Sequence, residues 1–114
     1  MDCIELSIQP LSINQVNLTG EQYAKWSEQV YRMLPPQETL TVDFTSPMAM
    51  HIDASFSNGL STSENIWKPL LDVMEKAYPE FNDNLVFEMS ASGYVTEDQD
   101  EVGYIVKMEN LDKF

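Results

Sequence analysis

The spacing of the apolar residues changes abruptly in the middle of this 114-residue chain. In "MAMHIDASF", residues 48–56, every second residue is apolar, which is typical of a strand with one buried face. After the turn "SNG", apolar residues recur at helical spacing, at Ile66, Leu70, Val73, Met74 and Ala77. A strand that leads into an amphipathic helix predicts helices packed against a sheet.

The same two periods recur along the rest of the chain. Capping-box patterns at Thr19 and Gln22, and at Ser61 and Glu64, predict one helix over about 20–34 and a second that ends near Pro79. Alternating segments predict strands at 3–10, 39–46, 48–56, 85–92 and 102–109, with 39–46 paired to 48–56 and 85–92 paired antiparallel to 102–109. We therefore predict an α+β fold, a mixed β-sheet with two helices in the order β-α-β-β-α-β-β.

Length and composition limit the domain organisation. A chain of 114 residues with 43% hydrophobic residues can bury one core and is too short for two ordinary domains, so we expect a single domain over 1–114. It contains no run of 18 apolar residues and does not begin like a signal peptide, so we expect a cytoplasmic protein without a membrane partner. The lone Cys3 cannot form an internal disulfide, and we expect it to be a small buried residue of the first strand.

Charge is the strongest global signal. The chain has 19 acidic and 6 basic residues, for a formal net charge of −13. Proteins gain affinity for phosphates through Lys and Arg, so we do not expect direct binding to nucleic acid. The negative field serves solubility alone, or it steers the chain to a basic surface such as a nucleic-acid-binding groove.

Local catalytic motifs are absent from the sequence. It has no Gly-rich phosphate loop, no Cys-x-x-Cys and no His-Glu-x-x-His. The only histidine, His51, lies two residues before Asp53 in a predicted strand, so both side chains belong to one face and predict a pair on the sheet surface. Trp26 has the spacing of a packed core residue.

Two segments carry a family resemblance. The sequence "SENIWKPLLDVM" followed by "FNDNLVFE" resembles the RusA family of phage and prophage Holliday-junction resolvases, and "IQPLSINQ" is similar to the start of that family's fold. The resemblance implies a RusA-like α+β domain. It also implies a homodimer and Mg²⁺-dependent cleavage of four-way DNA junctions.

The residues that the resemblance assigns to chemistry match only in part. Thr62 stands at the first metal-binding aspartate of the family, and a hydroxyl cannot replace a carboxylate for Mg²⁺. Glu64 occupies the second acidic position and Asp83 the third, while Asn65 and Lys68 match the family. The resemblance therefore implies Glu64 and Asp83 as metal ligands and Lys68 as a catalytic residue if the protein is active, with Mg²⁺ the only cofactor to expect.

The loops that would touch DNA in a resolvase lack basic residues. The segment before Thr62 reads "SNGLSTS", the loop before the first helix reads "QVNLT", and the loop between the last two strands reads "TEDQDE". These neutral and acidic segments reverse the electrostatic requirement for DNA. They favour a scaffold that now binds a protein.

The sequence-based hypothesis is therefore an acidic inhibitor on a degenerate RusA-like scaffold. Its target would be a basic nucleic-acid-binding protein, such as a host defence nuclease reached by DNA mimicry in the host cytoplasm, as in anti-CRISPR or anti-restriction proteins. Partner-binding candidates are Glu97, Asp98, Asp100 and Glu101, with Glu64, Asp72, Glu75 and Asp83. The alternatives are a Mg²⁺-dependent Holliday-junction endodeoxyribonuclease and an acidic subunit with no inhibitory role.

Overall fold

The computed structural model describes residues 1–11, 20–57 and 67–111. The main elements are β1 (Asp2–Leu6), α1 (Gly20–Met33), β2 (Met48–Ser57), α2 (Lys68–Ala77), β3 (Val86–Thr96) and β4 (Gly103–Asn110). Three short 3₁₀ turns join them: η1 (Gln37–Thr39), η2 (Asp83–Leu85) and η3 (Gln99–Glu101). Among the described residues, no helix is both long and apolar enough to cross a membrane.

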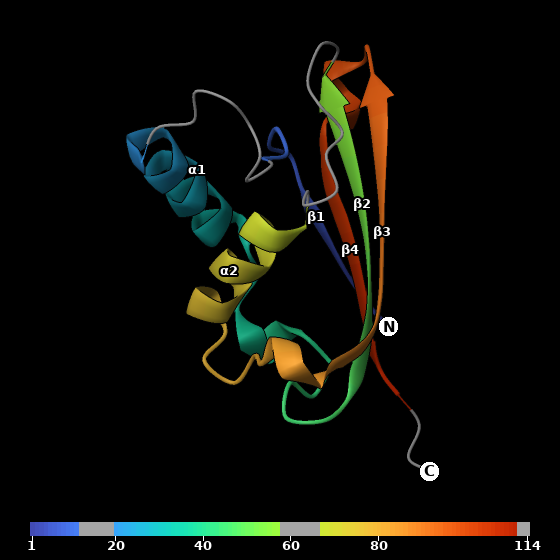
Figure 1. The fold of residues 1–114 in the computed structure, drawn as a ribbon. Helices are drawn as coiled ribbons and strands as arrows, with labels where there is room; N and C mark the ends of the chain where they lie inside the picture. Colours follow the sequence, from blue (N-terminus) through green and yellow to red (C-terminus); the bar gives the residue numbers. More distant parts are fainter. Residues whose placement is uncertain (12–19, 58–66, 112–114) are drawn as a thin grey trace.

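The strands form one four-stranded mixed sheet in the order β1-β4-β2-β3. Strand β4 is antiparallel to both β1 and β2, whereas β3 is parallel to β2. Both helices lie on one side of the sheet (Figure 1). The predicted α+β fold with a mixed sheet and two helices is thus confirmed, but the predicted pairing of 85–92 with 102–109 is wrong, because β2 lies between β3 and β4.

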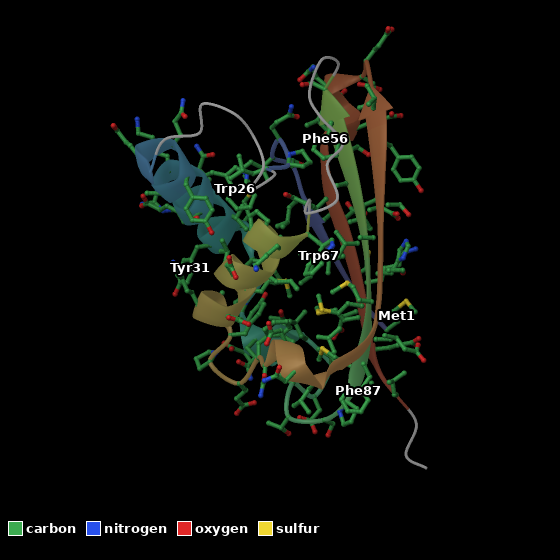
Figure 2. The ribbon with its side chains drawn as sticks, viewed as in Figure 1. Met1, Trp26, Tyr31, Phe56, Trp67 and Phe87 are labelled. Atoms are coloured by element: carbon green, nitrogen blue, oxygen red, sulfur yellow. The ribbon has the colours of Figure 1, made fainter. Side chains whose placement is uncertain are left out.

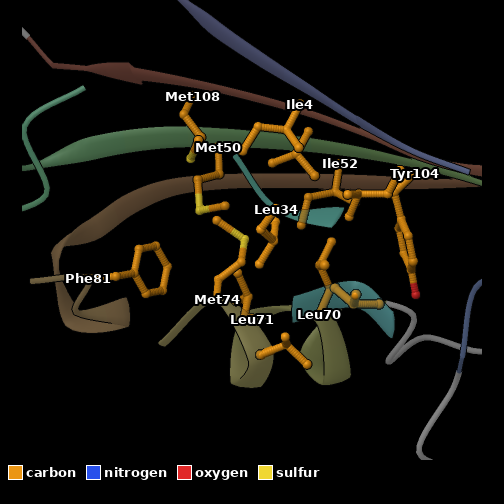
Figure 3. Packing of buried hydrophobic residues seen from close by; sticks show 14 of the residues in the cluster. Ile4, Leu34, Met50, Ile52, Leu70, Leu71, Met74, Phe81, Tyr104 and Met108 are labelled. Carbon is orange, nitrogen blue, oxygen red and sulfur yellow. The ribbon is translucent and has the colours of Figure 1, made fainter. Parts of the chain in front are cut away.

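The core lies between the helices and the facing side of the sheet. Strand β2 alternates as predicted and buries Met48, Met50, Ile52, Ala54 and Phe56 on that side. The apolar face of α2 meets them with Leu70 and Met74 (Figure 3), and Val30 of α1 and Val73 of α2 belong to the same buried cluster. Full burial of one such side chain contributes about 1.5–3 kcal/mol, so this layer holds the sheet and the helices together.

Trp26 is the packed residue that its spacing predicted. Its indole is 8% exposed and meets the ring of Tyr104 edge-on at 6.4 Å between centroids. Its Nε1 donates a hydrogen bond of 2.9 Å to the carbonyl oxygen of Gln9. Tyr104 is also tied to the chain after β1, because its hydroxyl accepts a hydrogen bond of 3.0 Å from the backbone N–H of Leu11. These contacts join α1 to β4 and to the segment that follows β1.

The predicted strand at 39–46 is absent. Thr39 ends η1, and residues 40–47 form no strand pairing, although Phe44 is buried and Leu40 and Val42 pack against the core. Side chains bind the backbone groups that a strand ladder would have used. The carboxylate of Asp2 accepts hydrogen bonds from the N–H of Thr41 (3.0 and 2.9 Å), the N–H of Val42 (2.7 Å) and the hydroxyl of Thr41 (2.9 Å).

Two further expectations from the sequence have clear outcomes. Cys3 was expected to be buried, but it is exposed, because the odd-numbered residues of β1 face away from the helices. The second helix begins at Lys68, with Pro69 in its first turn where proline is tolerated. The capping box predicted from Ser61 and Glu64 lies outside the described residues.

Asp2 is expected to stabilise the fold in a pH-dependent way. Burial alone would raise the pKa of Asp2, but the hydrogen bonds from Thr41 and Val42 outweigh it, and the pKa lies below its ordinary value. A lowered pKa in the folded state stabilises the protein above the pKa of the unfolded chain, near pH 4, and this stabilisation is lost as the pH falls through the folded value.

We predict that Asp2→Asn lowers the free energy of unfolding at pH 7 by about 1–3 kcal/mol, because its amide cannot accept every bond that the carboxylate accepts. Urea unfolding at pH 7 and at pH 2 measures the difference between variant and parent, which should shrink at pH 2. Glu5→Gln, an exposed change on the same strand, is the control. Equal stability of Asp2→Asn and the parent at pH 7 would refute this role of Asp2.

Candidate functional site

The side of the sheet away from the helices carries mostly polar side chains. No described helix covers this open face (Figure 1). Strand register places Cys3, Lys107, His51 and Ser90 in one row across it and Glu5, Ile105, Asp53 and Ser92 in the next. The open face is therefore a polar surface of mixed charge.

His51 and Asp53 form the surface pair that the sequence predicted. His51 Nε2 lies 3.0 Å from Asp53 Oδ1, and the two side chains are 40% and 25% exposed. The ring's other nitrogen, Nδ1, contacts the hydroxyl of Ser90 on β3. Sequence reasoning missed Ser90, because only the parallel pairing of β3 with β2 places it opposite His51.

A serine, a histidine and an aspartate in contact are also the groups of a hydrolytic triad. Here only His51 and Ser90 border an open hollow of about 270 Å³, which is below the usual size of a ligand pocket. Backbone N–H groups in a sheet point along its plane, so β2 and β3 aim no pair of donors at an oxyanion above this face. The arrangement fits a surface hydrogen-bond network that fixes the orientation of the imidazole.

The four acids of the last loop form the most concentrated charge among the described residues. We call Glu97, Asp98, Asp100 and Glu101 the acidic loop; all four are exposed between β3 and β4. Asp98 Oδ1 accepts a hydrogen bond of 2.9 Å from the N–H of Asp100, and Glu101 Oε2 accepts one of 2.8 Å from the hydroxyl of Thr96. These bonds lie within the loop and its flank, and they leave the four acidic residues exposed to solvent.

No Lys or Arg among the described residues forms an ion pair with the acidic loop. The two basic residues of α1 are used within that helix, where Lys25 pairs with Glu21 and Arg32 with Glu28. The acidic loop also borders a hollow of about 320 Å³ on the open face, which Glu5 of β1 lines together with Asp100 and Glu101. Glu5 therefore lies beside the acidic loop and adds its carboxylate to the same surface. The sequence could not indicate this proximity, because Glu5 and Asp100 are 95 residues apart.

A second group of acids lies where α2 meets η2. Asp72 and Glu75 are three residues apart on α2, which places them on one face of the helix, and Asp83 begins η2. We call these three residues the α2 acidic cluster. The carboxyl groups of Glu75 and Asp83 lie close enough to interact. Partial burial raises the pKa of Glu75, and the negative charges of Asp83 and Asp72 raise it further.

The metal site implied by the RusA resemblance is incomplete in the part of the chain that the structure describes. Asp83 meets Glu75, but no three Asp, Glu, His or Cys side chains in 1–11, 20–57 and 67–111 are arranged to hold a metal ion. Glu64, the other acid assigned to metal, lies outside these ranges, as do Thr62 and Asn65. Lys68 is exposed at the start of α2 and makes no hydrogen bond or ion pair with Asp83.

The two groups of acids flank β3 in the chain. The α2 acidic cluster precedes β3 and the acidic loop follows it, and β3 runs along the length of the molecule (Figure 2). Strand β3 has 11 residues, which corresponds to a length of about 35 Å at the rise of an extended strand. The candidate acids therefore provide two separate negative surfaces.

Comparison with known proteins gives no family for this chain. No protein-family profile matches the sequence, and no curated protein matches it. The resemblance to RusA resolvases stays a prediction from the quoted segments.

We predict that Glu75→Gln stabilises the protein slightly at pH 7, by roughly 0.5 kcal/mol or less, because solvent screens exposed charges. A raised pKa means that the ionised carboxylate costs stability above the folded pKa and costs nothing below the unfolded value near pH 4. Urea unfolding from pH 8 to pH 3 should show the gain fade as the pH falls. Glu109→Gln on β4 removes the same charge in the other layer. An equal gain from both variants would mean that only net charge matters.

Proposed function

We propose that this chain is an acidic protein-binding inhibitor that occupies the nucleic-acid-binding surface of a basic protein. The observation that carries the proposal is the acidic loop, whose four exposed carboxylates have no Lys or Arg partner among the described residues. A fixed cluster of unneutralised charge attracts a basic surface and repels polyanions.

The RusA resemblance supports the proposal that this acidic surface replaces a DNA-binding one. In the RusA resemblance, the acidic loop takes the place of a loop rich in Lys and Gly that would lie on DNA. A protein that presents carboxylates where phosphates are bound can compete for a nucleic-acid groove. The targets that fit this chemistry are host defence nucleases, so the proposed activity is that of an anti-CRISPR or anti-restriction protein acting by DNA mimicry.

A Mg²⁺-dependent Holliday-junction endonuclease is the second candidate, and one observation favours it. Asp83, which the resemblance assigns to metal, lies close to Glu75, and the negative charges of Asp83 and Asp72 both raise the pKa of Glu75. Grouped carboxylates suit hard divalent cations. Incubation with a labelled four-way junction and Mg²⁺ or Mn²⁺ tests this candidate, since cleavage that is lost in Asp83→Asn would replace the inhibitor with the nuclease.

The inhibitor proposal predicts that the position of the acids matters more than their number. Neutralising the acidic loop (Glu97→Gln, Asp98→Asn, Asp100→Asn, Glu101→Gln) should abolish capture of a basic protein from bacterial lysate at low salt. Asp98→Asn keeps an oxygen that can accept the hydrogen bond from the N–H of residue 100, so the loop keeps its shape. Capture by the parent should weaken steeply with added salt.

The matched control removes the same charge elsewhere, through Glu21→Gln, Glu38→Gln, Glu80→Gln and Glu109→Gln, four exposed positions outside the two acidic groups. This control should still capture the basic protein. Equal loss of capture in both quadruple variants would show that capture depends on the net charge of the protein and not on the position of the acids. Unchanged capture by the acidic-loop variant would exclude the loop as the interface.

A further inference from the structure

The two edges of the sheet differ in how they are protected. Strand β1 is five residues long, carries Asp2 and Glu5, and is flanked by the 41–42 backbone that its Asp2 side chain holds. Short, charged and covered strands resist pairing with other chains. Strand β3 has 11 residues, and no described strand pairs with its outer edge (Figure 1).

Strand β3 has few of the features that normally block an edge. Its sequence "VFEMSASGYVT" contains one charge, Glu88, and no proline or lysine. The register with β2 shifts once, where Phe87 is an extra residue, and it is regular from Glu88 to Thr96. Tyr94 and Val95 are 54% and 55% exposed. The regular part therefore offers a row of unpaired backbone groups between exposed apolar side chains.

The negative charges at the two ends of this edge determine which kind of strand can pair with it. Glu88 begins the regular part, and Glu97 directly follows its last residue and opens the acidic loop. If two copies paired antiparallel about Ser92, Glu88 of each would face Thr96 of the other, next to Glu97. Parallel pairing would bring the two acidic loops together. Both arrangements place like charges side by side, whereas a strand with basic ends places opposite charges there.

We infer that β3 is a docking edge for an extended segment of a basic protein partner, which adds to the sheet as a fifth strand with Lys or Arg beside Glu88 and the acidic loop. Main-chain hydrogen bonds along Glu88–Thr96 supply affinity, and the acidic ends supply selectivity. This inference rests on the proposed function for the nature of the partner and specifies how that partner is held.

A designed peptide tests the inference directly. The probe has a core of alternating Val and Thr with two lysines at each end, and its control has proline in place of the central Thr. Both carry the same charge, but the proline peptide cannot form a continuous strand. Amide hydrogen exchange, followed by NMR, should slow at alternate residues of β3 with the first peptide only. The first peptide should also bind about tenfold or more tightly than the second, because the proline peptide cannot form the continuous main-chain hydrogen bonds along the edge.

A variant of the edge provides the second measurement. Ala91→Lys places a positive charge in the middle of β3 and should weaken binding of the Val/Thr peptide, whereas Ala24→Lys makes the same exposed change on α1 and should not. If Ala91→Lys fails to fold, the hydrogen-exchange pattern of the parent protein with the two peptides still tests whether β3 is the docking edge.

The outcomes separate this inference from the proposed function. Equal binding of both peptides, lost when the acidic loop is neutralised, would overturn the docking edge and leave a charge-driven inhibitor. Protection of β3 that rises with protein concentration and no peptide would make the occupant a second copy and would also overturn the inference. Absence of binding by either peptide would count against both proposals.

Discussion

The pairing of β2 with β3 on one side and with β4 on the other determines most of what this protein exposes. Because β2 is internal, its even-numbered residues form the floor of the core, and the odd-numbered residues hold the centre of the open face. The same order forces the chain after β3 to pass over β2 to reach β4, and the acidic loop makes this connection. It also leaves β3 at the edge. The charged loop and the unpaired strand are thus two results of one strand order.

The sequence predicted the parts of the fold that depend on local periodicity. The alternation of 48–56, the helix at 20–34 and the apolar face of the second helix all correspond to observed elements, because each pattern reflects burial against a single layer. The strand predicted from the alternating segment 39–46 was wrong, because the N–H groups of Thr41 and Val42 donate to the side chain of Asp2 instead of to a neighbouring strand. A partner some 40 residues away leaves no local signal.

Only part of the candidate site could be predicted, because contacts between distant segments leave no local signal in the sequence. The acidic loop is visible in the sequence as a run of charge, and His51 and Asp53 share a face because they lie in one strand. Ser90 and Glu5 could not be found, because both enter through strand pairing between distant segments. The contact between Glu75 and Asp83 was equally hidden, since it depends on how η2 returns to α2.

The central claim is that the acidic surface competes with nucleic acid for a basic protein. The most direct measurement is the fraction of labelled duplex DNA bound to the captured basic protein as this chain is added at low salt. The account predicts that DNA is displaced completely, with a midpoint that rises when the acidic loop is neutralised and stays unchanged in the control that removes charges elsewhere. A ternary complex, in which the partner holds DNA and this chain together, would contradict it.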